Sequence, residues 1–401
     1  MLIQKTLSSS LCAVALLVSA ADIKADSFTD YKQTQQQNFQ ADTQKFIYYK
    51  NSLNQDFLNY KKAQQKAYNE YKEALKKYWD KPELSTKKRL VHYTQDKQTK
   101  TAIDFEKQKI EIQTIAKNKK EAKQKLAHAL LKATLIDTKQ LYKEDELLQK
   151  IAHIKTPSSI IKADVDAKPI LAPVVFDKKP STDELINYTK KSLEKNPIKE
   201  RVNSKQKHVY TLNVTLPSNT TIKRSRTYYQ EVQTAAKKEK LTPALIFAIM
   251  HTESSFNPYA RSYVPAYGLM QIVPKSAGID AYYYLYKKKR LVSGSYLYNS
   301  RNNIRMGSAY LHILYYSYLR YIKDPQSRLY CTIAAYNTGA GNVARAFVSS
   351  NSVKYAAQKI NAMSSDDVYA HLRRNLRYKE ARDYLLKVEK RRRMYKKIYG
   401  S

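Results

Sequence analysis

The residue best suited to chemistry is Glu253, which stands in the segment HTESSFNP. Across residues 241–347 the only other acidic residues are Asp280 and Asp324, in sequence that is typical of loops. Glu253 lies near the end of an apolar helix that we expect to begin at Pro243. Burial and the negative end of the helix dipole both favour a protonated carboxyl group there. A carboxyl group that stays protonated near neutral pH can act as a general acid.

The segment before Glu253 has the features of a single helix. Thr242 can cap its first turn, and Pro243 suits the first helical position. A broad apolar surface follows, and Pro258 is expected to end the helix. A surface ion pair is the ordinary role of a glutamate in a lysine-rich chain, and it remains the alternative. If this region does acid/base chemistry with a carboxylate, Glu253 is nearly the only candidate.

Glycine divides the chain, because all seven glycines lie at or after Gly268. Before them, residues 26–79 carry apolar side chains at steps of three, four and seven, which predicts one long amphipathic helix or a pair. After Pro82, the segment AIDFEKQKIEIQTIA alternates apolar and polar residues around a polar turn, which predicts a β-hairpin. The segment HVYTLNVTL at residues 208–216 is expected to join the same small sheet.

Helical patterns are expected near residues 119–134 and 139–153. Residues 155–181 contain four prolines and no helical period, which predicts an extended linker or an edge strand. From residue 221 onward nearly everything is predicted to be helical. The fold class is therefore α+β overall, with an α+β N-terminal domain at 26–220 and a mainly α C-terminal domain at 221–401.

The chain is strongly basic, with a formal net charge of +37. Such a charge favours an anionic neighbour, which can be nucleic acid, membrane headgroups or an acidic cell-wall polymer. Residues 1–25 combine an early lysine, a short apolar run and small residues, which predicts a secretory signal cleaved after Ala20 or Ala25. We therefore expect an exported, periplasmic protein that is soluble or loosely attached to a membrane such as the outer membrane.

The two cysteines contribute little chemistry. Cys12 lies at the beginning of the apolar run and follows a bulky leucine, so the sequence does not favour a lipoprotein signal. Removal of the signal leaves Cys331 alone, which excludes an intramolecular disulfide and a cysteine metal cluster. We expect Cys331 to be a small buried apolar side chain.

Four motifs occur in order over about 140 residues: HTESSFNPYARS, AYGLMQIVPKSAG, AAYNTGAGNV and YKEARDYLLKV. They resemble the Glu-Ser, Gly-Leu-Met-Gln, Ala-Tyr-Asn and C-terminal helix motifs of soluble-lytic-transglycosylase-type domains, the goose-lysozyme-like enzymes of the bacterial wall. The upstream segment TAIDFEKQKIEIQTIA resembles the N-terminal domain of the membrane-bound lytic murein transglycosylase C family. The resemblance covers most of the chain after the predicted signal and implies a lysozyme-like fold for the C-terminal domain.

The resemblance implies cleavage of the bond between N-acetylmuramic acid and N-acetylglucosamine in peptidoglycan, with a 1,6-anhydromuramoyl end and no net addition of water. Ordinary glycosidases use two carboxylates, whereas the matched motifs contain one. The resemblance implies that Glu253 protonates the departing oxygen and later takes the proton of the muramoyl 6-hydroxyl. Between these two proton transfers, the substrate's own acetamido group can stabilise the positive centre. No cofactor or metal is implied.

The resemblance also assigns the residues around the acid. Ser262, Met270 and Gln271 are expected to line the glycan cleft, with Ser262 and Gln271 hydrogen-bonding near the acetamido group. Tyr336 is expected to hydrogen-bond near the acid, and Asn337 to brace its loop. Taken alone, Met270 and Tyr336 are more often core residues, and a serine such as Ser262 is more often a helix cap.

Tyr384, in the last matching helix, is expected to close one wall of the cleft. Three positions depart from the family pattern. Thr338 stands where a second glycine is common, Tyr267 lies near a usual glycine or alanine, and Asn299 replaces a frequent loop aspartate. These departures leave the acid unchanged and bear on the shape of the cleft and on substrate preference.

Three other functions remain as alternatives. The first is a hydrolytic muramidase, which uses the same cleft but adds water. The second is a peptidoglycan-binding protein without turnover, against which the joint presence of Glu253, Gln271 and Tyr336 argues. The third is a nucleic-acid-binding protein, which only the charge supports and which the predicted export signal disfavours. The oligomeric state stays open.

Overall fold

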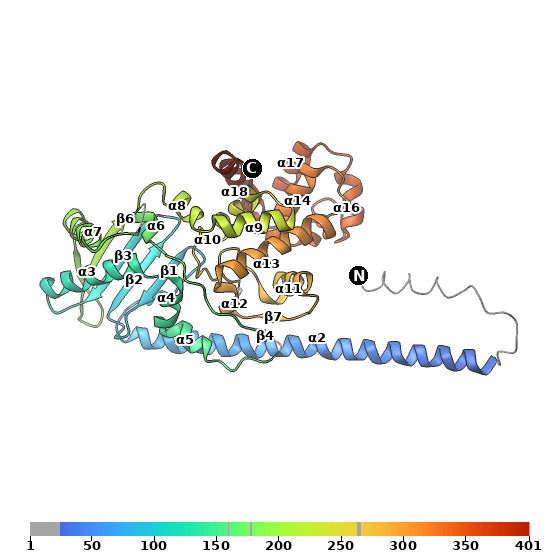
Figure 1. The fold of residues 1–401 in the computed structure, drawn as a ribbon, viewed down its shortest axis with the longest axis horizontal. Coiled ribbons are helices and arrows are strands. Elements are labelled where there is room, and N and C mark those ends of the chain that lie inside the picture. The colour runs from blue at the N-terminus through green and yellow to red at the C-terminus, as the bar shows by residue number, and fades with distance from the viewer. Residues whose placement is uncertain (1–24, 159, 177–178, 263–265, 401) are drawn as a thin grey trace. The chain divides into compact units, whose positions relative to one another are not determined.

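The computed structural model describes residues 25–158, 160–176, 179–262 and 266–400 (Figure 1). Residues 56–401 form one compact unit, and the residues up to 55 form a separate one, whose described part is helical. Nearly all of the predicted signal at residues 1–25 therefore lies outside the described residues, and the signal stays a prediction. Below, residues 56–219 are called the N-terminal region and residues 220–400 the C-terminal region.

The first helix, α2, is a single helix over Ala25–Lys76, as one of the two sequence interpretations predicted. Its apolar stripe becomes a packing surface from residue 60 onward, where Tyr60, Ala67, Tyr71 and Leu75 are buried. No helix among the described residues combines the length and the apolar composition needed to cross a membrane.

The sheet of the N-terminal region has five antiparallel strands in the order β1-β2-β3-β6-β5 (Figure 1). The predicted hairpin is confirmed, with Ile103 of β2 opposite Ile110 of β3. The predicted strand at 208–216 is confirmed as β6, which pairs with β3. The outer strands β1 and β5 were not predicted. The strand bounds are β1 Arg89–Tyr93, β2 Thr99–Asp104, β3 Lys109–Ile115, β5 Lys199–Val202 and β6 His208–Thr215.

Helices cover both faces of this sheet. Its strands carry apolar residues on both faces, and these residues pack against the helices. Helix α3, Lys119–Leu135, packs on one face through residues such as Leu126 and Leu130. On the other face, Tyr71 and Leu75 of α2 and the following Trp79 pack against the strands. The N-terminal region is therefore a three-layer arrangement of helix, sheet and helix.

The other helices of the N-terminal region after α3 are shorter, and side-chain caps define where several of them begin. The predicted helix at 139–153 is interrupted by Asp145, whose side chain accepts a hydrogen bond of 2.9 Å from the Leu148 amide and caps a new helix. Helix α7 begins with a capping box between Ser181 and Glu184. The bounds are α4 Thr138–Glu144, α5 Glu146–Ala152, α6 Ala172–Val175 and α7 Thr182–Lys195.

The proline-rich segment 155–181 connects the two regions directly. Its strand β4, Ile160–Ile161, pairs in parallel with β7, Leu291–Val292, of the C-terminal region. The Ser293 amide continues this contact with a hydrogen bond of 2.9 Å to the Ile161 carbonyl. The segment is thus in part the edge strand that the sequence allowed, and it is packed along the C-terminal region.

The C-terminal region is almost entirely helical and is built around α10, in which every residue from Ala244 to Met250 is buried. Helix α10 packs against the last helix, α18. Cys331 is buried and free, as expected. The bounds are α8 Thr220–Thr227, α9 Tyr229–Glu239, α10 Pro243–Ser254, η1 Pro274–Gly278, α11 Ile279–Tyr286, α12 Gly294–Tyr298, α13 Ser300–His312, η2 Ile313–Tyr318, α14 Pro325–Thr338, α15 Ala340–Arg345, α16 Val353–Ile360, α17 Ser365–Asn375 and α18 Lys379–Tyr399.

A buried arginine, Arg224 of α8, ties the two regions together. Its guanidinium lies 4.5 Å from the ring of Phe105, which follows β2. It also donates hydrogen bonds to the carbonyl oxygens of Ile170 and Phe256. Burial lowers its pKa, and carbonyl acceptors offset part of the cost of burying its charge. Because Phe256 lies just after α10, this contact braces the turn next to Glu253.

We expect Arg224→Ala to lower the free energy of unfolding by about 3 kcal/mol or more, because it leaves buried carbonyl oxygens unpaired and a cavity beside Phe105. Urea unfolding monitored by circular dichroism measures the change. The exposed Arg226 on the same helix provides the control, since Arg226→Ala should stay within about 0.5 kcal/mol of the parent. Equal losses in the two variants would contradict this role for Arg224.

Candidate active site

Glu253 occupies the last turn of α10 and is 6% exposed. The helix ends at Ser254 because Ser255 and Phe256 adopt the left-handed conformation, with φ of 50° and 63°. Pro258 therefore follows the stop and does not cause it, contrary to the sequence prediction. Thr242 stands at the N-cap position, but its side chain makes no capping hydrogen bond.

Burial of the Glu253 carboxyl group raises its pKa above the usual range, and burial is the largest of the influences on it. The Lys87 ammonium and the Tyr384 hydroxyl act in the opposite direction, since both favour the ionised form. The other carboxylate that acts on Glu253 is the exposed Glu380 of α18, which raises the pKa further. The net direction is toward a protonated acid, as the sequence analysis expected.

Two buried tyrosines lie near this carboxyl group. Burial, reinforced by the nearby Glu253, raises the pKa of both Tyr336 and Tyr384 well above 10, so both hydroxyls stay neutral. The Tyr336 hydroxyl donates to the Met270 carbonyl at 2.8 Å, which ties α14 to the Gly-Leu-Met-Gln turn. The Tyr384 hydroxyl is buried near this carboxyl group, and its oxygen has no hydrogen-bond partner among the described residues.

The Gly-Leu-Met-Gln turn is held by the protein itself. Asn303 of α13 is fully buried, donates to the carbonyls of Tyr267 and Leu297 at 2.8 Å each, and accepts from the Met270 amide at 2.8 Å. Gly268 has φ of 74°, and a Cβ there would lie 2.3 Å from Asn303 Nδ2. Both the positive φ and this internal crowding therefore require glycine at position 268.

The predicted cleft residues of this turn differ in environment. The Met270 side chain is fully buried, and a Cβ at Gly307 would lie 2.3 Å from its sulfur. Gln271 donates through Nε2 to the carbonyls of Ala260 and Gly268, at 3.0 and 3.1 Å. Its Oε1 is buried without a hydrogen-bond partner among the described residues, which leaves an acceptor free for a ligand.

Ser262 and Asn337 are both half-buried. The Ser262 hydroxyl accepts a hydrogen bond of 3.3 Å from the Ala266 amide, across the segment 263–265 that the structure does not describe. Asn337 is half-buried in the last turn of α14, and no hydrogen bond of its side chain to another described residue is seen. The bracing role expected for Asn337 and the contacts of all these side chains with a glycan stay predictions.

The serine beside the acid has a structural role that the sequence analysis did not assign. The Ser254 hydroxyl donates to the Met250 carbonyl at 3.0 Å and to the Leu269 carbonyl at 2.8 Å, and it accepts from the Phe256 amide at 3.1 Å. It therefore joins the end of α10 to the Gly-Leu-Met-Gln turn. In the Glu-Ser pair, the glutamate is the candidate acid and the serine fixes the backbone next to it.

Sequence analysis also missed Lys87, whose Nζ lies 3.9 Å from Glu253 Oε2. Lys87 is some 166 positions earlier in the chain and belongs to the N-terminal region. It occurs in the unremarkable run STKKR, so no local signal distinguished it from the other lysines. Only the packing of the two regions brings it to the acid.

Two of the three departures from the family pattern contact the N-terminal region. The Tyr267 hydroxyl donates to Gln64 of α2 at 2.8 Å. Asn299 donates to the Asp164 carbonyl at 2.9 Å and also caps α13. The third, Thr338, accepts hydrogen bonds from a neighbouring asparagine within the C-terminal region. Tyr267 and Asn299 thus fit the C-terminal region to its neighbour.

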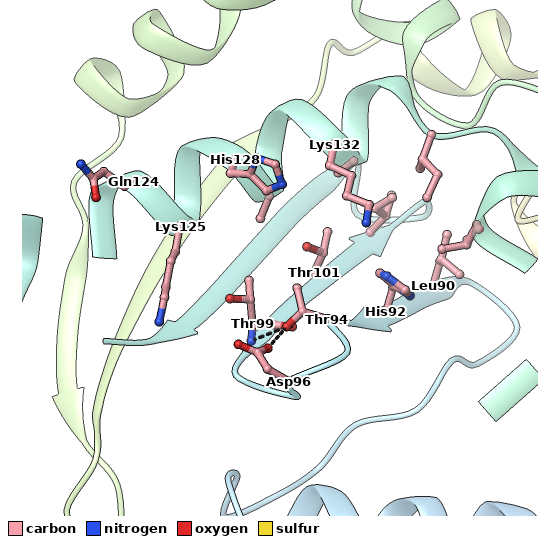
Figure 2. Close-up of a pocket in the computed structure, with 15 residues that line it drawn as sticks. Leu90, His92, Thr94, Asp96, Thr99, Thr101, Gln124, Lys125, His128 and Lys132 are labelled. Carbon is pink, nitrogen blue, oxygen red and sulfur yellow. Dashed lines mark hydrogen bonds between the residues drawn. The ribbon is translucent and has the colours of Figure 1, made fainter. Parts of the chain in front are cut away.

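A separate cavity of about 380 Å³ lies in the N-terminal region, between the sheet and α3 (Figure 2). Several of its polar groups already have partners, including His92 with Asp145 at 3.3 Å and Lys132 with Glu144 at 2.7 Å. Among the residues that the structure describes, no group of His, Cys, Asp or Glu side chains is arranged to hold a metal ion.

Two family models match this chain, one after the other along the sequence. Residues 39–227 match the model described as "Membrane-bound lytic murein transglycosylase C, N-terminal domain", and residues 230–359 match "Transglycosylase SLT domain". A membrane-bound lytic murein transglycosylase C from Klebsiella pneumoniae is 36% identical over 324 residues, which cover 78% of this chain and 83% of the relative. The chain belongs to the membrane-bound lytic murein transglycosylase C family. It is thereby a member of a family of enzymes, and the resemblance in its motifs is confirmed.

Another member of the membrane-bound lytic murein transglycosylase C family, from Mannheimia succiniciproducens, is 33% identical and covers 80% of this chain and 85% of the relative. Among solved structures, the 70 kDa soluble lytic transglycosylase SLT70 from Escherichia coli matches with a TM-score of 0.34 and 22% identity. That match covers 43% of this chain and 25% of the solved chain, so the solved protein is much longer than the part matched.

The raised pKa of Glu253 predicts a pH-dependent stability. Once the pH rises through that pKa, the folded protein must bury a carboxylate, and the stability conferred by the protonated form is lost. We therefore expect Glu253→Gln to unfold at a higher temperature than the parent at pH 8, and with a smaller difference at pH 4. Thermal unfolding at both pH values measures this.

The exposed Glu380 provides the matched control, since Glu380→Gln removes only a minor repulsion on Glu253 and should give a much smaller gain at pH 8. A Glu253→Gln protein that is less stable than the parent at pH 8 would show that the carboxylate is favourably paired in the folded state.

Proposed function

We propose that this protein is a peptidoglycan lytic transglycosylase, which cleaves the β-1,4 bond between N-acetylmuramic acid and N-acetylglucosamine and leaves a 1,6-anhydromuramoyl end. The observation that carries the proposal is the buried Glu253, whose pKa is raised by its burial. Membership of the membrane-bound lytic murein transglycosylase C family supports murein as the substrate.

In the first step, Glu253 gives its proton to the glycosidic oxygen as the bond from that oxygen to the muramoyl C1 breaks. A raised pKa suits this step, because the group must still hold its proton near neutral pH. The substrate's acetamido oxygen stabilises the positive charge at C1. No residue of the chain needs to attack this carbon.

In the second step, the muramoyl 6-hydroxyl oxygen bonds to C1, and its proton returns to the Glu253 carboxylate. The enzyme is then restored, and no water is added. Exclusion of water from the carboxylate favours this ring closure over hydrolysis, and a group that is 6% exposed offers little room for a water molecule. This burial is the reason for preferring a transglycosylase to a muramidase.

The surrounding residues take supporting parts in this proposal. Gln271 presents its unpaired Oε1 as an acceptor for the acetamido N–H, and Ser262 supplies a second hydrogen bond. Tyr336 holds the Met270 carbonyl and so positions the turn, Asn337 braces its loop, and Tyr384 limits one wall beside the acid. The roles of Gln271, Tyr336 and Tyr384 are supported by their positions and by the motifs, whereas those of Ser262 and Asn337 rest on the motifs alone.

We also propose that the protein acts outside the cytoplasm, in the remodelling or turnover of the cell wall. The predicted signal at residues 1–25 and the net charge of +37 support this. A basic surface favours contact with acidic stem peptides and with anionic membrane lipids. Its relatives are named membrane-bound, which supports attachment to an envelope membrane, such as the outer membrane.

Mass spectrometry of digested peptidoglycan tests the reaction. We expect the purified protein to release muropeptides that are one water lighter than those released by a hydrolytic lysozyme, because ring closure replaces the addition of water. Products of full mass would establish a muramidase. The absence of products, in a sample that binds peptidoglycan in a sedimentation assay, would establish a binding protein without turnover.

Substitution of the acid tests the assignment of Glu253. We expect Glu253→Gln to lower turnover at least about a hundredfold, because the amide cannot donate or take back a proton, while glycan binding is kept. Release of soluble muropeptides measures turnover. Glu380→Gln, which removes the neighbouring exposed carboxylate, should keep turnover within a few-fold of the parent. Substantial turnover in Glu253→Gln would refute the assigned acid.

A further inference from the structure

The N-terminal region sends one short loop to the candidate acid. This loop, residues 84–88, lies between the end of α2 and strand β1 and leads directly into β1. From it, Lys87 places Nζ 3.9 Å from Glu253 Oε2, and the Lys87 side chain is 40% exposed while that of Glu253 is 8% exposed. The ammonium group therefore lies at the boundary between solvent and the buried carboxyl group.

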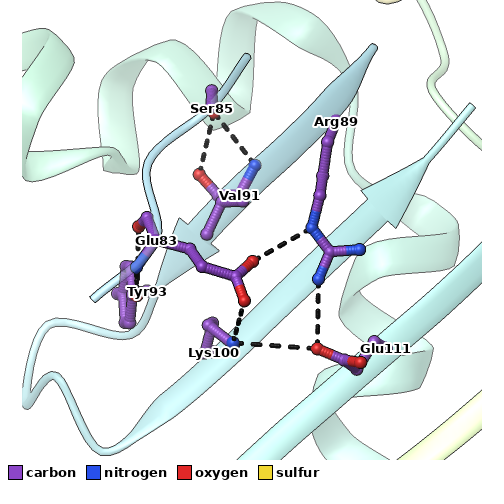
Figure 3. Close-up of polar contacts among 7 residues, drawn as sticks. All are labelled: Glu83, Ser85, Arg89, Val91, Tyr93, Lys100 and Glu111. Atoms are coloured by element: carbon purple, nitrogen blue, oxygen red, sulfur yellow. Dashed lines mark hydrogen bonds and ion pairs between the residues drawn. The ribbon is translucent and has the colours of Figure 1, made fainter. Parts of the chain in front are cut away.

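The loop is anchored on its own side by polar contacts (Figure 3). The Ser85 hydroxyl accepts from the Val91 amide at 2.9 Å. Glu83 accepts from Arg89 at 3.0 Å and from Lys100 at 3.2 Å. Both ends of the loop are thus fixed to strands β1 and β2.

The C-terminal region holds the same loop from the other side. Asn257 is fully buried, and its Nδ2 donates to the carbonyls of Thr86 and Lys87 at 3.2 and 3.3 Å. Asn257 follows the left-handed turn that ends α10, so it is rigidly related to Glu253. The backbone of Lys87 and the acid are therefore placed by the same turn.

We propose that Lys87 is a positioning residue of the reaction, through which the N-terminal region orients the Glu253 carboxylate and stabilises it between the two proton transfers. This inference rests on the proposed function. It explains why the loop is braced from both regions at the point where it passes the acid. It also gives the N-terminal region a part in turnover in addition to any part in binding.

The other ionisable groups around Glu253 do not supply this charge. On the same loop, Lys88 forms an ion pair with Glu106 and has a smaller influence on the acid. From α18 the carboxylate of Glu380 acts in the opposite direction, and from α14 and α18 come the neutral hydroxyls of Tyr336 and Tyr384. Lys87 thus has the largest influence of the groups that favour the carboxylate.

The pH profile of turnover separates this role from a merely structural one. Turnover needs protonated Glu253, so it falls as the pH rises through the pKa of that group. Lys87 favours the ionised form, and its removal should move this alkaline limb to higher pH. For a half-exposed pair we expect a displacement of a few tenths of a pH unit to about one unit, together with a several-fold lower maximum rate.

Three variants test the proposal. Lys87→Gln should show the displaced limb, Lys87→Arg should restore the limb of the parent because it keeps the charge, and Lys88→Gln, which removes a neighbouring charge, should show little displacement. Thermal unfolding of each variant checks the fold. An alkaline limb that is unchanged in Lys87→Gln would overturn the proposal. A limb displaced as far in Lys88→Gln or in Lys87→Arg as in Lys87→Gln would also overturn it.

These results are distinguishable from failure of the proposed function. If Glu253→Gln is inactive and Lys87→Gln keeps the parent profile, only the role of Lys87 is refuted. If Glu253→Gln remains active, the assigned acid fails, whatever the Lys87 variants show.

Discussion

The rest of this structure depends on the burial of one carboxyl group at the end of an apolar helix. Every residue of α10 from Ala244 to Met250 is buried, so the helix cannot shift without disturbing the core. Glu253, in the last turn of this helix, is held in a fixed position. Its own burial raises its pKa. Around it the protein has placed backbone ties and neutral tyrosine hydroxyls. Burial leaves the proton on the acid, and the backbone ties hold its position, as an acid that must later act as a base requires.

The two regions of the compact unit are joined most closely where they approach this acid. Arg224 binds carbonyls on both sides of the junction, and Tyr267 reaches Gln64 of α2. Lys87 and Asn257 meet beside the turn that ends α10. Tyr267, one of the positions expected to depart from the family pattern, thus contacts the N-terminal region. The N-terminal region thus places a cation, Lys87, beside the candidate acid.

Much of the fold followed from local pattern, and the misses have local reasons. The hairpin around Ile103 and Ile110 and the strand at 208–216 show clear alternation, and the sheet confirms both. Strand β5 was missed because all its residues are exposed, so it lacks an apolar signal. The helix at 139–153 was predicted as one piece because the capping role of Asp145 does not appear in the apolar period. Pro258 was predicted to end α10, but the left-handed conformation of Ser255 ends it. The prediction was wrong because the residue type serine does not indicate a positive φ.

For the site, the sequence by itself determined the candidate acid and its motif partners. A lone glutamate at the end of an apolar helix, with few other acids near it in the chain, can be recognised from residue types and spacing alone. Tertiary structure decided what the partners do: Tyr336 holds a carbonyl, and Met270 packs against Gly307. It also decided that Lys87 faces the acid, because an ion pair between residues so distant in the chain exists only once both regions have packed. Local pattern carries information about neighbours along a helix or strand, whereas the electrostatics of a buried group are set by whatever the whole fold brings within a few ångströms of it.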